Sequence, residues 1–378
     1  MIMYSPFRHL NSVFWKKNPI QLTFFLTRRC NLRCPFCFYL SGDREAHARS
    51  DGEKGEFNHQ LSAGGKSSEL SLDEIEKISS SLGKLLWLAF SGGEIFLRND
   101  IVEITKIFYE KNKPSIILFP TNGLLTEVIK ERIGEILNHC RKSTIVVKLS
   151  LEGLEDLHDS VRGVKGSFQK TMQTYGALRE LLDIYPNFDL GINTVFSSSN
   201  QDHMDELIEF VNGLEGIRTH TVSLIRGTVS DKELKAIDCE KYHRTINRLA
   251  SNLKQKISAI YKFKGAKLKA AQDILQRRMI YRTMKRKKQL IPCYAGRLNL
   301  VLTETGEVYP CESFTMGMGN IRDNDYDLTK ILKNDKAQKH IRSIQAKNCY
   351  CTHECYLMTN ILFNPSMYPS LLKEYTRL

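Results

Sequence analysis

The sequence predicts an α/β fold, in which a parallel sheet with helices outside curves into a partial (β/α)6 barrel and a small cysteine-rich region follows. Two observations predict it. From Gln21 onward, six short β-rich runs alternate with amphipathic stretches, the pattern of a parallel sheet covered by helices. In addition, five of the ten cysteines fall within residues 293–355. In parallel sheets of this kind, ligands bind at the carboxyl ends of the strands.

The individual elements follow from periodicity and from start signals. The expected strands are residues 21–26, 85–90, 115–119, 144–150, 189–195 and 219–225. The expected helices between them are residues 72–82, 100–110, 124–137, 167–182 and 202–211. For the first helix, Ser71 can cap the N-terminus and Glu74 stands at the capping-box position. After the barrel, residues 298–303 and 308–309 around Gly306 are expected to form a hairpin.

These elements divide the chain into four segments. They are an N-terminal extension (1–20), a core barrel (21–230), a basic helical segment (231–292) and the cysteine-rich region (293–378). Within the barrel, residues 41–68 are rich in Gly, Ser and charged residues. We expect a mobile loop there, either without a function or ordering over the site when a substrate binds.

Cysteine usage and hydropathy indicate a cellular location. Hydrophobic residues make up 42% of 378 residues, enough for a sizeable core. The clustering of the cysteines is typical of metal binding, whereas disulfide frameworks belong to small secreted domains. The sequence has neither an apolar run approaching 18 residues nor a signal-peptide core. We therefore expect a cytoplasmic protein with reduced thiols.

The excess positive charge lies in one segment. Residues 231–292 carry 18 Lys and Arg against 5 Asp and Glu, which equals the net charge of +13 of the whole chain. Apolar residues at helical spacing predict two helices broken near Gly265. The charge is compatible with a solvated face or with an anionic partner. The partner could be a membrane surface, which would make the protein peripheral to the membrane, or a phosphorylated substrate. Nucleic acid is favoured less, since few aromatic residues lie among the charges.

Three cysteines follow the first expected strand directly. Cys30, Cys34 and Cys37 have the spacing C-x3-C-x2-C, which lets one compact loop present three thiolates to one [4Fe–4S] cluster. Three ligands for four irons leave one iron open for chemistry. A zinc site is the alternative, but zinc usually needs a fourth ligand.

With this trio, the sequence resembles the radical S-adenosylmethionine (SAM) superfamily. The resemblance implies that SAM chelates the open iron and that electron transfer cleaves it to a 5′-deoxyadenosyl radical, which abstracts a substrate hydrogen. It also implies a reductant such as flavodoxin or ferredoxin. Phe36 matches the aromatic residue that packs near the adenine in this family.

Further motifs of the family appear in the expected order. Gly92, Gly93 and Glu94 follow the second expected strand and resemble the turn that holds the ammonium group of SAM, although Ile95 replaces the usual proline. The resemblance assigns four more residues to the cofactor. Ser150 and Glu152 would approach the ribose and the methionyl carboxylate, Arg162 would pair with that carboxylate, and Asn193 would touch the cofactor. Many relatives have Asp where Glu152 stands.

The C-terminal cysteines resemble the auxiliary-cluster domains called SPASM and twitch. Cys293 is separated from Cys311 by a segment containing Gly306, and Cys349, Cys351 and Cys355 complete the set. The fuller SPASM pattern has seven cysteines for two clusters. Five cysteines imply one second [4Fe–4S] cluster on four of them, with either one thiol spare or one iron open. A zinc ribbon is the alternative.

The resulting hypothesis is a radical SAM enzyme of unknown substrate, which could be a peptide, a sugar-like molecule or a lipid-linked small molecule. About 20 residues precede the first strand, and no separate domain for binding a leader peptide is visible, which disfavours the peptide. Two alternatives remain. One is a radical SAM enzyme that modifies RNA, and the other is a non-catalytic iron–sulfur or zinc protein that mediates interactions.

Overall fold

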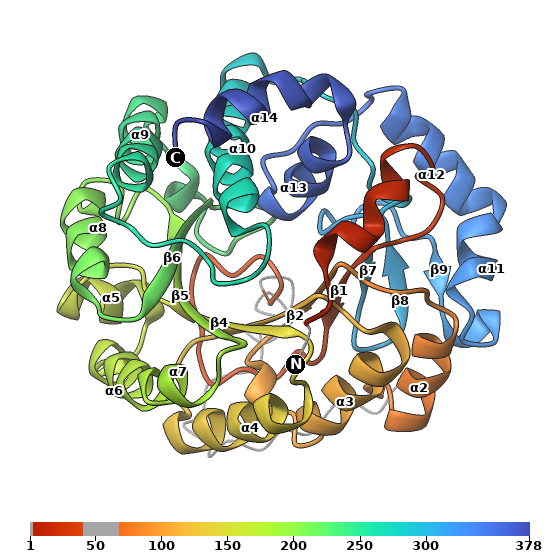
Figure 1. Cartoon of the computed structure of the whole chain (residues 1–378), viewed down its shortest axis with the longest axis horizontal. Coiled ribbons are helices and arrows are strands. Elements are labelled where there is room, and N and C mark those ends of the chain that lie inside the picture. Colours follow the sequence, from red (N-terminus) through yellow and green to blue (C-terminus); the bar gives the residue numbers. More distant parts are fainter. Residues whose placement is uncertain (1–2, 41–67) are drawn as a thin grey trace, which may run out of the picture.

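A nine-stranded sheet organises the computed structural model, which describes residues 3–40 and 68–378 (Figure 1). Its strand order is β6-β5-β4-β3-β2-β1-β7-β8-β9, with β1 to β7 parallel and β8 and β9 antiparallel. The strands are β1 (Gln21–Phe25), β2 (Trp87–Ser91), β3 (Ile116–Thr121), β4 (Thr144–Ser150), β5 (Phe188–Phe196), β6 (Ile217–Leu224), β7 (Asn299–Leu302), β8 (Glu307–Tyr309) and β9 (Gly319–Asn320).

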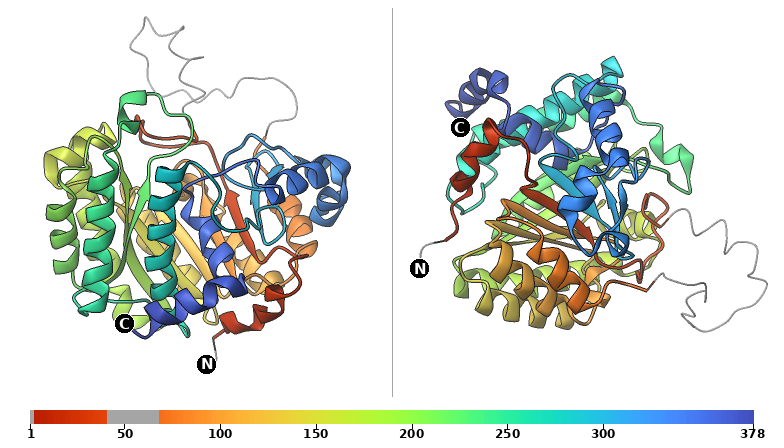
Figure 2. Two further views of the ribbon diagram at one scale, coloured as in Figure 1. Left: turned by 90° about the horizontal axis from the view of Figure 1, so that it is seen from above. Right: turned by 90° about the vertical axis from the view of Figure 1, so that its right-hand side faces the viewer.

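Helices cover the outer face of this curved sheet, as Figure 1 shows for α3 to α8. The helices up to β6 are η1 (Pro6–Val13), α2 (Leu72–Ser80), η2 (Ile95–Leu97), α3 (Ile101–Asn112), α4 (Thr126–His139), α5 (Glu155–Arg162), α6 (Ser167–Arg179), α7 (Leu181–Ile184) and α8 (Met204–Gly213). The later ones are η3 (Lys232–Lys235), α9 (Cys239–Lys254), α10 (Ala266–Arg286), η4 (Arg322–Asn324), α11 (Leu328–Lys333), α12 (Asp335–Gln345), α13 (Glu354–Leu362), η5 (Pro365–Met367) and α14 (Tyr368–Tyr375). Both views of Figure 2 place η1 and α14, near the two ends of the chain, on the same side of the molecule.

Alternation along the strands separates the core from the site. Side chains such as Leu22, Leu88 and Ile117 point outward and pack with the covering helices in one large apolar cluster. Their neighbours in sequence point inward and line a cavity, for example Thr23 and Ala89. The barrel therefore buries one face of each strand for stability and presents the other to a ligand.

The structure confirms the predicted alternation of six parallel strands with helices. Each strand begins and ends within about two residues of its predicted limits. The capping box is present, since Ser71 Oγ accepts from the Glu74 amide at 3.3 Å and a Glu74 carboxylate oxygen accepts from the Ser71 amide at 2.9 Å. One predicted helix, residues 167–182, is divided into α6 and α7. The predicted loop 41–68 lies, apart from Ser68, outside the described residues.

The cysteine-rich region continues the barrel sheet. Its predicted hairpin is confirmed as β7 and β8, with Leu302 opposite Val308. The sequence did not predict that β7 pairs in parallel with β1, with Gln21 opposite Asn299. The C-terminal region thus covers the edge of the first barrel strand.

The basic segment forms two helices, as predicted, but the first is shorter than its apolar pattern indicated. Helix α9 ends at Lys254, and Ile257 lies beyond it and is exposed. Within the helix, Ile246 and Leu249 are buried in the main apolar cluster. The part of the stripe that lies within α9 therefore packs inside the protein. The described part of the chain has no helix both long and apolar enough to cross a membrane.

Candidate active site

One cavity of about 340 Å³ opens at the carboxyl ends of the barrel strands. It brings together every residue that the sequence assigned to the first cluster and to SAM. These lining residues are Cys30, Cys34, Phe36, Cys37, Gly92, Gly93, Glu94, Ser150, Glu152, Arg162 and Asn193. They come from the ends of four strands and from the last residue of helix α5, and they are separated by up to 163 residues in the sequence, so only the fold collects them.

The cysteine loop directly follows β1. Its backbone turns back so that the Cys37 amide donates to the Cys34 carbonyl at 3.1 Å. The Leu32 amide donates to Cys30 Sγ at 3.4 Å, and Arg162 Nη1 donates to Cys34 Sγ at 3.6 Å. Hydrogen-bond donors that point at sulfur stabilise the thiolate form of a cysteine. They also shift the reduction potential of a cluster that such thiolates ligate. The donor set fits a cluster, although among the described residues no three His, Cys, Asp or Glu side chains surround a single-ion position.

The two glycines of the second motif allow their turn to pack directly against the cysteine loop. The Gly93 amide donates to the Thr27 carbonyl at 2.8 Å, so the turn lies against the backbone that leads to Cys30. A Cβ atom on Gly93 would stand 2.0 Å from the Arg29 carbonyl oxygen, and one on Gly92 would stand 2.4 Å from the Thr27 oxygen. Gly92 also has a φ of 132°, which side chains disfavour. The glycines thus permit the turn and the cysteine loop to touch.

Glu94 is buried and held by three donors from its surroundings. Its carboxylate accepts from Thr121 Oγ1 at 2.9 Å and from the amides of Asn122 and Phe96 at 2.8 and 3.2 Å. Burial raises the pKa of Glu94 to about 7, although these hydrogen bonds and Arg162 oppose the rise. The carboxylate is therefore positioned rigidly at the cavity wall before a ligand arrives.

Arg162 and Glu152 form a buried ion pair beside Phe36. Arg162 Nη2 lies 2.6 Å from Glu152 Oε1, and the other Glu152 oxygen accepts from the Val195 amide at 2.7 Å. The guanidinium carbon stands 5.4 Å from the centroid of the Phe36 ring. Arg162 Nε is buried and has no hydrogen-bond partner among the described residues, so it retains a donor for a further acceptor.

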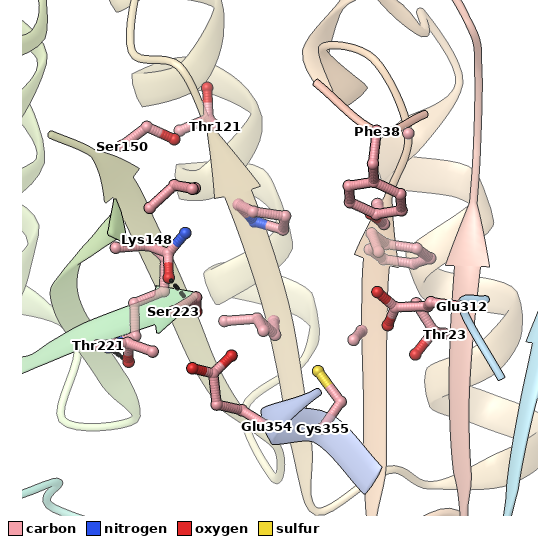
Figure 3. Close-up of a pocket in the computed structure, with 18 of the residues that line it drawn as sticks. Thr23, Phe38, Thr121, Lys148, Ser150, Thr221, Ser223, Glu312, Glu354 and Cys355 are labelled. Carbon is pink, nitrogen blue, oxygen red and sulfur yellow. Dashed lines mark hydrogen bonds between the residues drawn. The ribbon is translucent and has the colours of Figure 1, made fainter. Parts of the chain in front are cut away.

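The inner part of the cavity carries charged residues that the sequence reasoning missed (Figure 3). Helices α10 and α13 supply Asp273 and Glu354, and β4 supplies Lys148. The further polar and charged lining residues of this part that the sequence did not indicate are Gln21, Thr23, Thr221, Ser223, Arg226, Tyr261, Lys269, Gln276 and Glu312. Two signals could have found some of them: Lys148 interrupts an apolar strand, and Arg226 directly follows the last strand.

Arg226 links two carboxylates across this inner part. It forms an ion pair with Glu312, and its Nη1 lies 4.0 Å from Glu354 Oε2. Burial raises the pKa of Glu354 to about 7, and Arg226 opposes that rise. The other carboxylate oxygen of Glu354, Oε1, is buried and has no hydrogen-bond partner within the part of the chain that the structure describes. An unmatched buried oxygen is costly, so it marks a place where a ligand could donate a hydrogen bond.

A second cavity, of about 220 Å³, is lined by four of the five C-terminal cysteines. Cys293, Cys311, Cys349 and Cys351 line it together. Cys355 lines the large cavity instead. Helix α13 lies between the two, because Tyr356, Leu357 and Asn360 face the second cavity while Met358 faces the first.

Comparisons with known proteins agree with this architecture. Residues 24–211 match the model of the radical SAM superfamily, and residues 293–356 match the SPASM iron–sulfur cluster-binding domain. The AdoMet-dependent heme synthase of Methanosarcina barkeri is 25% identical over 82% of this chain and 81% of its own length. The antilisterial bacteriocin subtilosin biosynthesis protein AlbA of Bacillus subtilis is 27% identical over 82% of this chain and 59% of its own length.

The fold is also shared with a solved structure. Streptococcus suis SuiB bound to SAM superposes with a TM-score of 0.58 at 17% identity, covering 86% of this chain and 68% of that one. The chain belongs to the radical SAM superfamily and carries a SPASM domain after its barrel. It is a radical SAM enzyme that uses SAM and [4Fe–4S] clusters.

Proposed function

We propose that this enzyme cleaves SAM at the outer part of the large cavity and removes a hydrogen atom from a peptide side chain held in the inner part. The observation that carries the proposal is that one continuous cavity joins the three cysteines of the barrel to the charged residues of α10 and α13. A radical formed at one end would meet a substrate at the other without crossing solvent.

The residues of the outer part each receive a role. Cys30, Cys34 and Cys37 would ligate the first cluster, which together with bound SAM supplies the radical. The unpaired Nε of Arg162 and the face of Phe36 would orient the methionyl carboxylate and the adenine. Glu94, Ser150, Glu152 and Asn193 would complete the contacts, with the backbone of Gly92 and Gly93 holding the turn.

The auxiliary cluster would occupy the second cavity. Cys293, Cys311, Cys349 and Cys351 line it together, which supplies the four thiolates that one [4Fe–4S] cluster requires. Of the five candidates, Cys355 would then be the spare thiol. Cluster binding also requires these thiols to lose their protons, which burial opposes in the cluster-free chain by raising the pKa of Cys293 to about 11.

The hydrogen-bonding capacity of the inner part supports a peptide over a tetrapyrrole. AlbA is named for the biosynthesis of a bacteriocin, and another relative is named PqqA peptide cyclase, whereas two further relatives are heme or coproporphyrin synthases. In this wall Arg226 pairs with Glu312 and Glu354, and Lys269 pairs with Asp273, while Glu354 Oε1 has no hydrogen-bond partner among the described residues. A ligand that donates hydrogen bonds fits this oxygen, whereas the carboxylates of a tetrapyrrole can only accept them. A peptide can present amides and cationic groups to the same wall.

The partners predicted for this enzyme stay proposals. A flavodoxin or ferredoxin would supply the electron. For the basic segment, an anionic partner would meet a surface whose charge is partly neutralised, since Glu374 pairs with Lys254 and Arg278, and Glu240 pairs with Lys285. The partner would therefore contact the exposed end of α10 around residues 286–288.

The proposal is tested anaerobically. Wild type, a Cys30/Cys34/Cys37→Ala variant and a Cys239→Ala control are reconstituted with iron and sulfide, reduced with dithionite and given SAM. We expect 5′-deoxyadenosine from wild type and the control and none from the triple variant, which should retain about four irons per chain. A library of synthetic peptides should raise the yield more than Fe-coproporphyrin III does. Stimulation by the porphyrin alone would overturn the peptide assignment, and no cleavage by loaded wild type would overturn the site assignment.

A further inference from the structure

Exposed hydrophobic side chains gather at one end of the barrel. Eleven large hydrophobic residues are exposed among the residues that the structure describes, and seven of them lie in η1, directly after it, or in α14. Phe14 and Trp15 are 75% and 64% exposed, and their ring centroids lie 5.9 Å apart. The other five are Phe7, Leu10, Tyr368, Leu372 and Tyr375. Single exposed residues need no explanation, whereas such a concentration marks a contact surface.

Three segments that are far apart in the sequence form this surface. Both views of Figure 2 place η1 and α14 on the same side of the molecule. The start of α10 contacts both, because a Cβ atom on Gly265 would stand 3.4 Å from Phe7 Cζ and Lys267 Nζ stands 4.7 Å from the centroid of the Tyr375 ring. We call this surface the aromatic–basic face and define it by residues 3–17, 262–267 and 363–378.

The aromatic–basic face lies at the amino ends of the barrel strands. The Tyr4 amide donates to the carbonyl of Lys142, shortly before β4, at 2.7 Å, and Arg8 donates to the carbonyl of Lys113, shortly before β3. The cysteine loop instead follows the carboxyl end of β1. The basic residues 286–288 lie at the opposite end of α10 from this face. A partner bound to the aromatic–basic face would therefore leave the mouth of the large cavity open.

The charge of this face has one sign. Its three segments carry eight Lys and Arg and a single acidic residue, Glu374. That carboxylate is buried and pairs with Lys254, Arg278 and Arg377, so it is already neutralised from within the protein. The basic residues of the face are Arg8, Lys16, Lys17, Lys262, Lys264, Lys267, Lys373 and Arg377.

This combination of rings, aliphatic side chains and positive charge favours one kind of partner. Trp and Tyr side chains prefer the interfacial region of a bilayer, and neighbouring Lys and Arg side chains are attracted to anionic headgroups. A second copy of the chain would bring the same positive charges together in a symmetric contact, which repulsion disfavours. Single-stranded RNA can stack on aromatic rings, but it offers no apolar surroundings to Leu10 and Leu372.

We propose that the aromatic–basic face binds the surface of an anionic lipid bilayer. The side chains of Phe14, Trp15 and Leu372 would enter the headgroup region, and the lysines around them would meet the lipid phosphates. The enzyme would then be peripheral to the membrane, with the mouth of its large cavity turned toward the solution. This inference goes beyond the proposed function and does not depend on it.

Sedimentation with vesicles tests the inference. The full chain, reconstituted with its clusters, is mixed with vesicles of phosphatidylcholine alone or of phosphatidylcholine and phosphatidylglycerol at about two to one. We expect binding to the mixed vesicles that weakens steeply as salt is added, and binding about ten-fold weaker or less to phosphatidylcholine alone.

Matched variants connect this binding to the face. Trp15→Ser should weaken it about five-fold or more, whereas Ile184→Ser, which alters a side chain that is also 64% exposed but lies on α7, should bind as wild type does. Lys16→Gln/Lys17→Gln should weaken binding about ten-fold or more. Its control is Lys165→Gln/Lys170→Gln, which removes two exposed lysines elsewhere and should bind as wild type does.

Tryptophan fluorescence reports the depth of the contact. The chain has two tryptophans, and Trp15 is exposed whereas Trp87 is buried. Mixed vesicles should shift the emission to shorter wavelengths, and lipids brominated near the headgroup should quench it. Trp15→Phe should abolish both effects while retaining most of the binding, because the phenylalanine ring still enters the interface.

The outcomes are distinct. Failure of wild type to bind the mixed vesicles, or equal binding by wild type, Trp15→Ser and Lys16→Gln/Lys17→Gln, would overturn the inference. A dimer that Trp15→Ser converts to a monomer, without vesicle binding, would assign the face to a second copy. Displacement of bound vesicles by single-stranded RNA would assign it to nucleic acid.

SAM cleavage, measured as 5′-deoxyadenosine, serves as the control for folding. None of the substituted residues lines the large cavity, so each variant should cleave SAM as wild type does. Loss of vesicle binding with SAM cleavage retained would support the membrane face. Vesicle binding by a wild type that fails to cleave SAM would overturn the proposed function alone.

Discussion

Lys148 is a lysine buried inside the barrel, and its burial disfavours the charged form of its amino group. It lies on β4 at 5% exposure, donates to the Thr219 carbonyl at 3.4 Å and to Thr221 Oγ1 at 3.3 Å, and has no carboxylate within ion-pair distance among the described residues. Gly191 makes room for it, since a Cβ atom there would stand 2.6 Å from Lys148 Nζ. Burial lowers the pKa of Lys148 to about 7, and Lys269 acts in the same direction.

This lowered pKa predicts a pH dependence of stability. Between pH 7 and pH 9 an unfolded lysine keeps its proton, whereas the folded Lys148 loses it. The unfolded state then binds more protons, so the free energy of unfolding should rise with pH, by up to about 1.4 kcal/mol per pH unit from this group. Urea unfolding of cluster-free wild type and Lys148→Met at pH 7, 8 and 9 checks this. A smaller slope in the variant is expected, and equal slopes would contradict it.

At the scale of single elements, the turn after β2 is where the site depends on a missing side chain. Gly93 contacts the backbone that precedes Cys30. In helix α4, no described atom outside the neighbouring helix backbone lies within 4 Å of the position that a Cβ on Gly134 would take. The two glycines therefore allow a controlled comparison, because an added methyl group would clash at Gly93 and would fit at Gly134.

Gly93→Ala should therefore destabilise the protein by about 1–3 kcal/mol, because the cysteine loop must move to admit the methyl group. Gly134→Ala should stabilise it by roughly 0.5–1 kcal/mol, because alanine loses less backbone entropy in a helix. Denaturant midpoints of the cluster-free proteins measure both changes. If Gly93→Ala were as stable as Gly134→Ala, the close contact between the turn and the loop would be wrong.

At the scale of the whole molecule, the barrel and the SPASM region share one sheet. Strand β7 pairs with β1 along Gln21 to Phe24, and β8 and β9 extend the same sheet. Every residue of β1 is buried. Removing the C-terminal region would expose the edge of this strand, and an exposed apolar edge promotes aggregation.

A fragment of residues 1–289 should accordingly fail to form a stable monomer. We expect it to elute as aggregates in size-exclusion chromatography and to lack a cooperative thermal transition, whereas the full chain should elute as a folded species with a cooperative melt. A fragment that unfolds cooperatively as a monomer would show that the barrel is stable without β7.

The local order of the chain determined the α/β architecture, because strand alternation and helix periodicity are properties of neighbouring residues. The capping box at Ser71 and the spacing of Cys30, Cys34 and Cys37 are short-range patterns of the same kind. Glu94 and Glu152 could be singled out because they follow a strand end within a few residues, whereas Arg162 lies twelve residues beyond β4, at the end of helix α5.

Only the tertiary structure decided which distant side chains share a cavity. Arg226, Glu312 and Glu354 belong to three separate segments, and nothing in their local sequence indicates that they meet. The same holds for the five C-terminal cysteines. Their spacing is compatible with several sets of four, and it is helix α13, packed between the two cavities, that directs Cys355 to one side and leaves Cys293, Cys311, Cys349 and Cys351 on the other. The direction of a side chain depends on the packing of its helix against elements far away in the sequence, and this packing is absent from any local pattern.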